Sequence, residues 1–297
     1  MTDHLAPLFL IGPGYSAQAL AAIWQGRVAA TVRSKASLSD LDGTAMDLVW
    51  IGQGAHPNVN GTDWVEFNAA LDGAHIIISA PPGEVGCPAL ALVGAQASMA
   101  ASVTYLSTTG VYGDLGGGWA MEWTPVTPGS ERAKRRAAAE EAWRAVRPDL
   151  RIVRLPGIYG PGRSALERVK AGTARRILKP GQVFSRVHVD DIASGLKALI
   201  EAGEAHTDGR VSGVFHLTDE EAAPPQDVIA YAADLLGVES PPEVAFEAAD
   251  LSPMARSFYA ECKRVSNARV KAVTGWRPKY TTYREGLRAL AMGLTKS

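Results

Sequence analysis

The chain has 297 residues, 46% of them hydrophobic and 21% charged, enough to bury the core of one large domain or one and a half ordinary ones. This composition excludes a disordered or fibrous chain. The 30 Lys and Arg residues against 31 Asp and Glu residues leave a formal net charge of -1. Because there is no global basic field, we expect neither nucleic acid nor an anionic membrane surface as a partner.

The two cysteines indicate whether the chain has disulfides or a metal site, and the N-terminus indicates whether it is secreted. Cys87 and Cys262 lie far apart, without CxxC spacing or a nearby His pair, which argues against a disulfide framework and against a metal site. Residues 1–4 (MTDH) carry an acid where a secretory leader needs Lys or Arg. The most apolar stretch, residues 90–106, is rich in Ala and is interrupted by Gly94, Gln96 and Ser98. We therefore expect a soluble, cytoplasmic protein.

Short apolar runs alternate with helical patterns in the first half of the chain. The runs predict β-strands at residues 8–11, 28–32, 48–51, 76–79, 103–107 and 151–155. Helical spacing is predicted after the first run, around residues 87–100 and over residues 130–146, where Ser130 suits an N-cap. Continuous apolar strands that alternate with helices predict an α/β fold with a parallel sheet covered on both faces.

The pattern loosens after about residue 160, where Gly and Pro become frequent. Helices are predicted at residues 190–201, 225–236 and 284–292, and a strand at residues 214–217. We therefore divide the chain into a core over residues 1–160 and a remainder, residues 161–297, that adds the last core elements and a smaller mixed lobe. No linker or repeat separates the two parts, which we expect to form one structural unit.

A glycine turn follows the first predicted strand. Its sequence, GPGYSA at residues 12–17, has the pattern G-x-G-x-x-A between a strand and a helix. Glycines permit a tight turn and a close backbone approach, and a helix N-terminus offers N–H groups and partial positive charge to a pyrophosphate. The alternative is a turn that merely joins the two elements. The predicted cofactor contacts here are Gly12, Gly14, Tyr15, Ser16 and Ala17.

The end of the second predicted strand favours one dinucleotide over the other. An acid at this place binds the ribose hydroxyl of NAD, whereas Arg suits the 2′-phosphate of NADP. This chain has Arg33 followed by Ser34, so NADP is favoured and NAD remains possible. If Arg33 is only a solvated surface residue, that preference is lost. After the fourth strand, Ala80, Pro81 and Pro82 are expected to pass over the cofactor as an extended segment.

Four further segments occur in a recognisable order: LSTTGVYG at residues 106–113, RLPGIYGPG at 154–162, VHVDDIA at 187–193 and GWRP at 275–278. With them the chain resembles the extended short-chain dehydrogenases/reductases, the group of nucleotide-sugar epimerases and dehydratases, from residue 8 to about residue 290. The resemblance implies a doubly wound Rossmann-type sheet of about seven parallel strands with a small mixed C-terminal substrate lobe. It also implies cofactor contacts at Leu155 and Ile158.

The resemblance assigns catalytic positions, and the chain departs from two of them. The family uses a Ser or Thr, which falls on Thr108, and a Tyr followed four residues later by a Lys. No tyrosine lies between residues 113 and 158, and the two positions fall on Arg132 and Arg136. A permanently charged guanidinium cannot exchange protons as a phenol does. Arg136 can still bind the cofactor ribose and Arg132 an anionic substrate group, and the pattern looks like that of the atypical short-chain dehydrogenases.

Other side chains are candidates for the missing chemistry. Tyr112 and Tyr159 could each replace the phenol, or each could be a packed member of its loop. His188 is the residue of the matched segments that titrates near neutral pH, and its alternative is also a packed role. We predict Tyr159, Arg186 and His188 as substrate contacts.

Two functions of different class fit these observations. One is an NADP-favouring oxidoreductase or epimerase-like enzyme that acts on a small polar substrate. The other is a non-catalytic NADP-binding sensor or interaction protein that has lost the Tyr and Lys pair. The superfamily also pairs the helix at residues 130–146 across a dimer axis, which makes a homodimer possible here.

Overall fold

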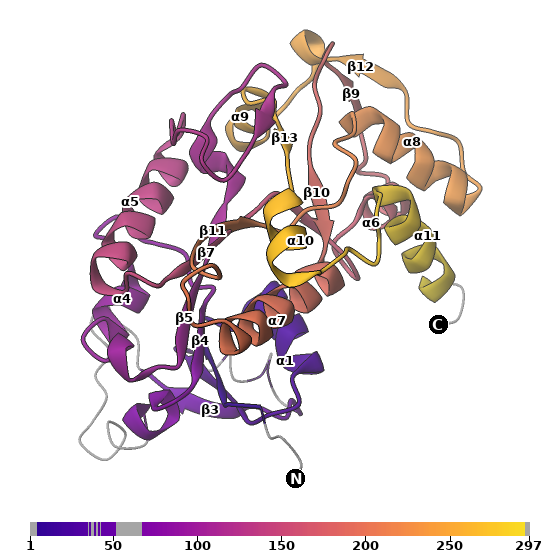
Figure 1. Cartoon of the computed structure of the whole chain (residues 1–297). Coiled ribbons are helices and arrows are strands. Elements are labelled where there is room, and N and C mark those ends of the chain that lie inside the picture. The colour runs from indigo at the N-terminus through magenta and orange to yellow at the C-terminus, as the bar shows by residue number, and fades with distance from the viewer. Residues whose placement is uncertain are drawn as a thin grey trace. The chain divides into compact units, whose positions relative to one another are not determined.

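A computed structural model describes residues 5–34, 36, 39, 41, 43–51 and 67–294 of the chain. The chain forms two compact units whose segments interleave (Figure 1). The sheet unit comprises Met1–Thr108, Glu131–Arg154 and Leu196–Phe215, and the lobe unit comprises Thr109–Ser130, Leu155–Gly195 and His216–Ser297. Residue 160 is thus not a boundary between the units. The leader expectation for residues 1–4 lies outside the described residues.

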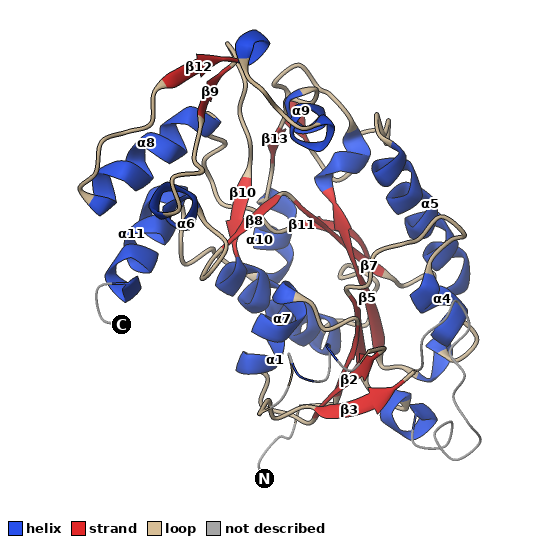
Figure 2. Cartoon of the chain, turned by 180° about the vertical axis from the view of Figure 1, so that it is seen from behind, coloured by secondary structure: helices blue, strands red, loops and turns tan. Residues whose placement is uncertain are grey.

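The sheet unit contains a seven-stranded parallel sheet, which confirms the predicted α/β Rossmann-type fold (Figures 1 and 2). The strand order is β11-β7-β5-β4-β1-β2-β3. Strand bounds are β1 Leu8–Ile11, β2 Val28–Val32, β3 Asp47–Trp50, β4 His75–Ile78, β5 Ser102–Thr108, β7 Arg151–Leu155 and β11 Gly213–His216. Six strands match predicted runs within a residue at each end. β11 is the run predicted at residues 214–217, and it returns to the edge of the sheet beside β7.

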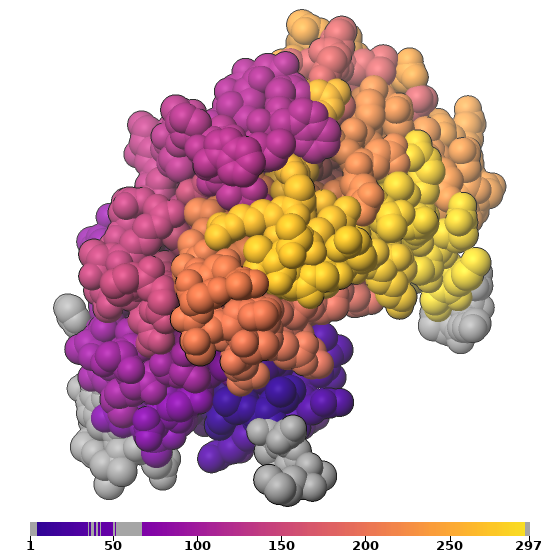
Figure 3. Space-filling view, viewed as in Figure 1, coloured from indigo at the N-terminus to yellow at the C-terminus, as the bar shows by residue number. Residues whose placement is uncertain are grey.

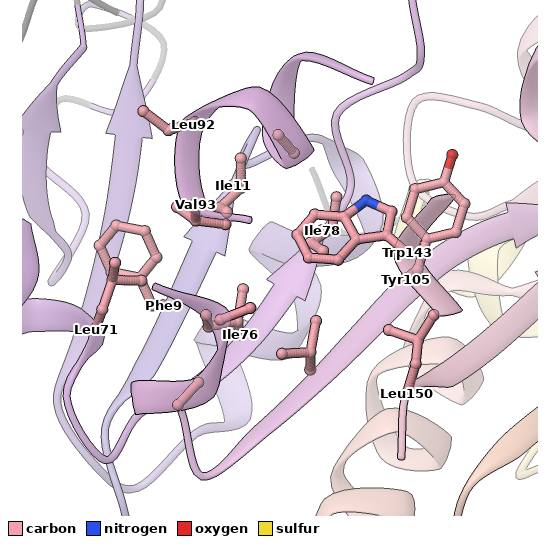
Figure 4. Close-up of a cluster of buried hydrophobic side chains, with 14 of the residues drawn as sticks. Phe9, Ile11, Leu71, Ile76, Ile78, Leu92, Val93, Tyr105, Trp143 and Leu150 are labelled. Atoms are coloured by element: carbon pink, nitrogen blue, oxygen red, sulfur yellow. The ribbon is translucent and has the colours of Figure 1, made fainter. Parts of the chain in front are cut away.

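The strands are buried on both faces, and alternate side chains point to opposite faces of the sheet. Phe9 and Ile11 of β1 and Ile76 and Ile78 of β4 point to one face, where they share a buried cluster with Trp143 (Figure 4). Helices α4 (Pro88–Val93) and α5 (Glu131–Val146) cover this face. Helix α1 (Tyr15–Ile23) lies on the other face (Figures 1 and 2). Helices on both faces make the sheet doubly wound.

Helical bounds differ most from the sequence prediction near residues 87–100. There α4 ends at Val93, and a short 3-10 helix, η1, follows at Ala97–Met99. Helix α5 begins at Glu131, as the pattern predicts. No helix among the described residues is both long and apolar enough to cross a membrane.

A buried polar network joins the amino ends of neighbouring strands in the sheet unit. His75 Nδ1 lies 2.9 Å from Ser102 Oγ, and His75 Nε2 lies 3.0 Å from a Glu204 carboxylate oxygen. Arg151 donates from Nη1 to Ser102 Oγ at 2.9 Å and from Nε to the Val211 carbonyl at 3.0 Å. Burial lowers the pKa of His75, against the opposing pull of the Glu204 carboxylate.

We expect His75 to make folding sensitive to mild acid. Its pKa is lowered on folding, so the unfolded chain takes up a proton near pH 6.5 before the folded protein does. The stability contributed by the neutral imidazole is therefore present above pH 6.5 and is lost as pH falls from there through the folded pKa. Proton NMR of the imidazole should show that His75 titrates below pH 6.5. Titration at or above pH 6.5 would contradict this.

The lobe unit consists of three two-stranded sheets and a group of helices. Its strands are β6 Trp119–Ala120, β8 Gly157–Tyr159, β9 Arg176–Leu178, β10 Arg186–His188, β12 Glu243–Ala245 and β13 Arg264–Val265, paired as β10-β8, β12-β9 and β13-β6. Its helices are α6 Ala165–Lys170, α8 Pro225–Leu236, α9 Pro253–Tyr259, α10 Ala268–Thr274 and α11 Tyr283–Leu294, with the short 3-10 helices η2 Thr109–Tyr112 and η3 Phe246–Ala248. Helix α7 (Val189–Ala205) begins in the lobe unit and ends in the sheet unit.

The core of the lobe unit lies between its helices. Val228 and Ile229 of α8 pack with Tyr283 and Leu287 of α11 in one buried cluster. Figure 3 shows the yellow C-terminal segment against the orange α8 segment. The predicted helix at residues 225–236 has the same bounds as α8, because Pro225 begins it and Gly237, in the left-handed conformation, ends it.

Candidate functional site

The loop between β1 and α1 has the geometry that its glycines predict. Gly12 has φ 76°, and its N–H donates to Thr31 Oγ1 on β2 at 3.1 Å. The Gly14 N–H donates to the Gly12 carbonyl at 2.7 Å. A Cβ on Gly12 would lie 2.9 Å from backbone atoms of Ala80. Glycine at position 12 is therefore required both by the backbone conformation and by the neighbouring loop.

The N-terminus of α1 is open to an anion. Gly14 is the N-cap and supplies no side-chain cap, and the first turn contains no acidic residue. Ser16 and Ala17 are buried against the sheet, while Tyr15 is half-buried. A helix start without a side-chain cap has N–H donors and partial positive charge available for a phosphate.

Strand order brings the other predicted cofactor residues to the same edge. In the order β5-β4-β1-β2, the carboxyl ends of adjacent parallel strands lie in a row. That row carries the predicted residues Thr108, Ala80, Pro81, Pro82, the glycine loop, Arg33 and Ser34. Arg33 is exposed at the end of β2, and Ser34 is half-buried. The N–H groups of Ser79 and Ala80 donate to the Ile11 carbonyl, which ties the ends of β4 and β1 together.

A buried ion pair fixes α5 beside the end of β5. Arg154 donates from Nε to Glu140 Oε1 at 3.1 Å and from Nη2 to Glu140 Oε2 at 2.5 Å. Ser107 Oγ donates to Glu140 Oε1 at 2.5 Å. The two charged side chains are 2% and 1% exposed. This network joins β5, α5 and β7 directly next to Thr108.

The two arginines of α5 occupy different environments. Arg136 is half-buried and donates from Nη1 to the Leu106 carbonyl at 2.8 Å and to the Tyr105 hydroxyl at 3.3 Å. Burial raises the pKa of Tyr105 to about 12, although the Arg136 charge opposes this shift. Arg132 is exposed. Arg136 therefore braces the end of β5, and its binding to a ribose stays a prediction.

Tyr112 is enclosed by its neighbours in the lobe unit. The residue is fully buried, and its hydroxyl lies 2.6 Å from His216 Nε2. His216 Nδ1 lies 2.9 Å from the Ser266 carbonyl, which requires the proton on Nδ1 and leaves Nε2 to accept from the Tyr112 hydroxyl. These contacts favour a structural role for Tyr112, and its acid–base role stays a prediction.

Tyr159 is also a poor proton donor. Its hydroxyl is buried, with no hydrogen-bond partner in the described part of the chain. A Cβ on Gly286 of α11 would lie 2.1 Å from that oxygen, so the phenol occupies space that only glycine leaves. Burial raises the pKa of Tyr159 further above neutrality. The predicted replacement of the missing phenol by Tyr159 is therefore not supported by its surroundings.

His188 is buried in the neutral form. Its Nδ1 accepts from the Asp190 N–H at 3.2 Å, and burial lowers its pKa. Its ring packs on Tyr159 and Tyr280, at centroid distances of 5.1 Å and 4.4 Å. These contacts favour the packed role for His188.

The lobe unit contains a cavity of about 410 Å³. It is lined by three of the predicted residues, Ile158, Tyr159 and Arg186, but not by His188. Leu155, the last residue of β7, is buried. The cavity thus gathers part of the predicted substrate set within one unit.

Sequence reasoning missed several residues that shape these sites. Thr31 supports the glycine loop, Glu140 and Arg154 form the buried pair, His216 holds Tyr112, and Gly286 admits Tyr159. Each acts on a residue at least 14 positions away in the chain. No local pattern marks such contacts.

Comparison with known proteins gives a relative that covers nearly the whole chain, and solved structures that share its fold. No family profile matches the chain. The structure of a functionally unknown conserved protein from Silicibacter pomeroyi DSS is 41% identical over 97% of this chain and 99% of that one, with a TM-score of 0.82. A 3-diazoavenalumate denitrifying reductase from Streptomyces sp is 29% identical over 149 residues, which are 46% of this chain and 45% of the reductase. The match to this curated relative thus spans less than half of its length.

Solved structures with lower identity share the fold. A putative NAD-dependent epimerase/dehydratase from Methylobacillus flagellatus superposes with a TM-score of 0.74 at 21% identity, over 98% of this chain and 99% of that chain. A dTDP-glucose 4,6-dehydratase from Bacillus anthracis str. Ames, in complex with NAD, gives 0.72 at 16% identity, over 98% and 97%.

Proposed function

From the premise that this chain belongs to one family with the Silicibacter pomeroyi protein and has the fold of the NAD-dependent epimerases and dehydratases, we propose that it is a nicotinamide-dinucleotide-dependent oxidoreductase or epimerase-like enzyme. The observation that carries the proposal is the uncapped N-terminus of α1 behind Gly12 and Gly14. The reductase from Streptomyces and the NAD complex of the dehydratase support the same chemistry.

The residues present fit a dinucleotide. Gly14 has φ -79°, which other residues also adopt. A Cβ there would meet only an ordinary contact with Ser79 Oγ at 3.5 Å. The protein itself therefore does not require glycine at position 14, and we attribute this glycine to a group that approaches from outside the protein. The first turn of α1 would hold the pyrophosphate, and Arg33 the 2′-phosphate that distinguishes NADP. When bound, the nicotinamide ring supplies or accepts a hydride.

The protein's own groups would orient the substrate. Thr108, at the end of β5, can donate its hydroxyl to a substrate carbonyl. Arg132 is exposed and can attract an anionic group, but a permanent cation cannot transfer a proton. A proton needed by the reaction would then come from water or from the substrate itself.

A second function follows from the burial of both alternative phenols. With Tyr112 bonded to His216 and Tyr159 enclosed by α11, a cofactor-binding sensor without turnover is the competing proposal. Thr108→Ala separates the two: it should lower turnover of an enzyme and leave the cofactor-dependent behaviour of a sensor unchanged.

The small-molecule substrate and the homodimer also stay proposals. In the sheet unit, Ala139 and Trp143 of α5 belong to the internal cluster, which leaves Val146, 43% exposed, as the largest apolar side chain for a partner helix. Sedimentation velocity would measure the oligomeric state directly.

The cofactor is tested by parallel titration of the purified protein with NADPH and NADH, followed through its seven tryptophans. We expect NADPH to bind at least about tenfold more tightly, worth roughly 1.4 kcal/mol. Arg33→Ala should remove this difference by weakening NADPH alone. Arg27→Ala is the matched control, because Arg27 is also exposed but precedes β2 and pairs with Asp47.

Two results would contradict the proposal in different ways. Equal affinity of the unaltered protein for both dinucleotides would remove the NADP preference. Binding of neither would remove the proposed function altogether.

A further inference from the structure

The cavity of the lobe unit is lined by a cation whose position is fixed by the backbone. Arg186 of β10 donates from Nη1 to the carbonyls of Phe184, at 2.8 Å, and Ala223, at 3.1 Å. Its Nε and Nη2 make no hydrogen bond to any described residue. Arg186 lines the cavity, and because one nitrogen is anchored while the other two make no such bond, its guanidinium keeps a pair of donors in a fixed orientation for a ligand.

No acid in the described part of the chain forms an ion pair with Arg186. Glu167, the acid that lines the cavity, already accepts from the N–H and the hydroxyl of Ser164, at 2.8 and 2.5 Å, and from the Gly162 N–H at 3.2 Å. Asp219 is buried and makes no ion pair with Arg186, and burial raises its pKa well above the usual value although the Arg186 charge opposes this shift. Arg163 and Arg168 add positive charge to the cavity lining.

The remaining walls of the cavity are apolar. Val228 of α8 and Leu287 of α11 line it together with the ring of Tyr283, which lies 6.0 Å from the Arg186 guanidinium carbon. A volume of about 410 Å³ lies within the range of small-molecule sites. A forked guanidinium beside apolar walls suits a small organic acid, whose carboxylate takes two parallel hydrogen bonds and whose carbon skeleton packs on the walls.

We propose that this cavity binds a small, partly apolar organic acid, whose carboxylate is held by Nε and Nη2 of Arg186 and whose carbon skeleton packs on Val228, Tyr283 and Leu287. This inference deepens the proposed function and rests on it in one respect: the acid is taken to be the substrate of the enzyme. Binding to the cavity itself requires no cofactor.

The test uses 4-fluorobenzoate as the probe and fluorine NMR of the full-length protein, without dinucleotide. We expect saturable binding of 4-fluorobenzoate and no binding of 4-fluorobenzamide, which has the same shape without the charge. Arg186→Lys keeps the charge but loses the forked donor pair, and it should weaken binding at least tenfold. Arg288→Ala is the control, because Arg288 is exposed on α11 and does not line the cavity.

Each alternative result decides the proposal. Equal binding of the amide, or unchanged binding by a folded Arg186→Lys protein, would overturn it, and circular dichroism establishes the folding of the variant. Displacement of the probe by inorganic phosphate at a tenfold lower concentration would overturn the carboxylate assignment in favour of a phosphate. Parallel NADPH titration separates failure of this site from failure of the proposed function.

Discussion

Replacement of Glu140 by Ala is expected to lower the free energy of unfolding by about 3–5 kcal/mol. The variant leaves the Arg154 cation, 2% exposed, without its bidentate partner, and it also removes the acceptor of the Ser107 hydroxyl. A buried charge that has lost its partner costs far more than the pair contributed. Urea denaturation followed by tryptophan fluorescence measures the change.

Two further variants isolate the cause. The double variant Glu140→Leu with Arg154→Met removes both charges at similar volume, and most of the lost stability should return. Glu141→Ala removes the next acid on α5, which pairs with Arg144 at the surface, and it should leave the urea midpoint nearly unchanged. A Glu140→Ala protein as stable as Glu141→Ala would refute the importance of the buried pair.

Gly12→Ala is expected to weaken dinucleotide binding at least about hundredfold, or about 2.8 kcal/mol at 1.4 kcal/mol per factor of ten. The added Cβ would lie 2.9 Å from the Ala80 backbone, so the loop must shift and carry the N-terminus of α1 with it. The positive φ of 76° adds roughly 1–2 kcal/mol of backbone strain. Fluorescence titration with NADPH measures the affinity, and urea denaturation measures the strain.

Two other glycines separate strain from binding. Gly73 also has a positive φ, 65°, but a Cβ there would meet nothing within 4 Å. Gly73→Ala should therefore lose stability and keep its affinity for NADPH. Gly14→Ala should do the opposite, because its backbone is unstrained and its Cβ would stand where the pyrophosphate is proposed to approach. Full NADPH affinity in both Gly12→Ala and Gly14→Ala would show that the dinucleotide does not bind at this loop.

Local patterns predicted most of the sheet and the glycine loop. The runs at residues 8–11, 28–32 and 151–155 have the same bounds as β1, β2 and β7, because buried parallel strands are continuous apolar segments bounded by turns. The turn at residues 12–14 was readable because only glycine tolerates the backbone of Gly12.

The candidate site was predicted less completely. Its positions along the chain follow from the order of the strands, whereas the state of each side chain depends on neighbours far away in sequence. In the sequence, Tyr112 and Tyr159 are both available phenols. In the structure, His216 lies beside the Tyr112 hydroxyl, and Gly286 of α11 lies against the Tyr159 hydroxyl. The sequence predicted Arg186 as a substrate contact, but only the structure shows that the carbonyls of Phe184 and Ala223 hold one of its nitrogens.

The sequence by itself therefore determined the fold class, most of the strands and the dinucleotide loop, since these depend on hydrophobic period and on backbone conformations that residue types set locally. Only the tertiary structure decided that β11 returns to the sheet, that Glu140 and Arg154 pair in the interior and that the two tyrosines are enclosed. The physical reason is that burial, ion pairing and the space left by a missing Cβ are properties of surroundings that separate segments of the chain build together.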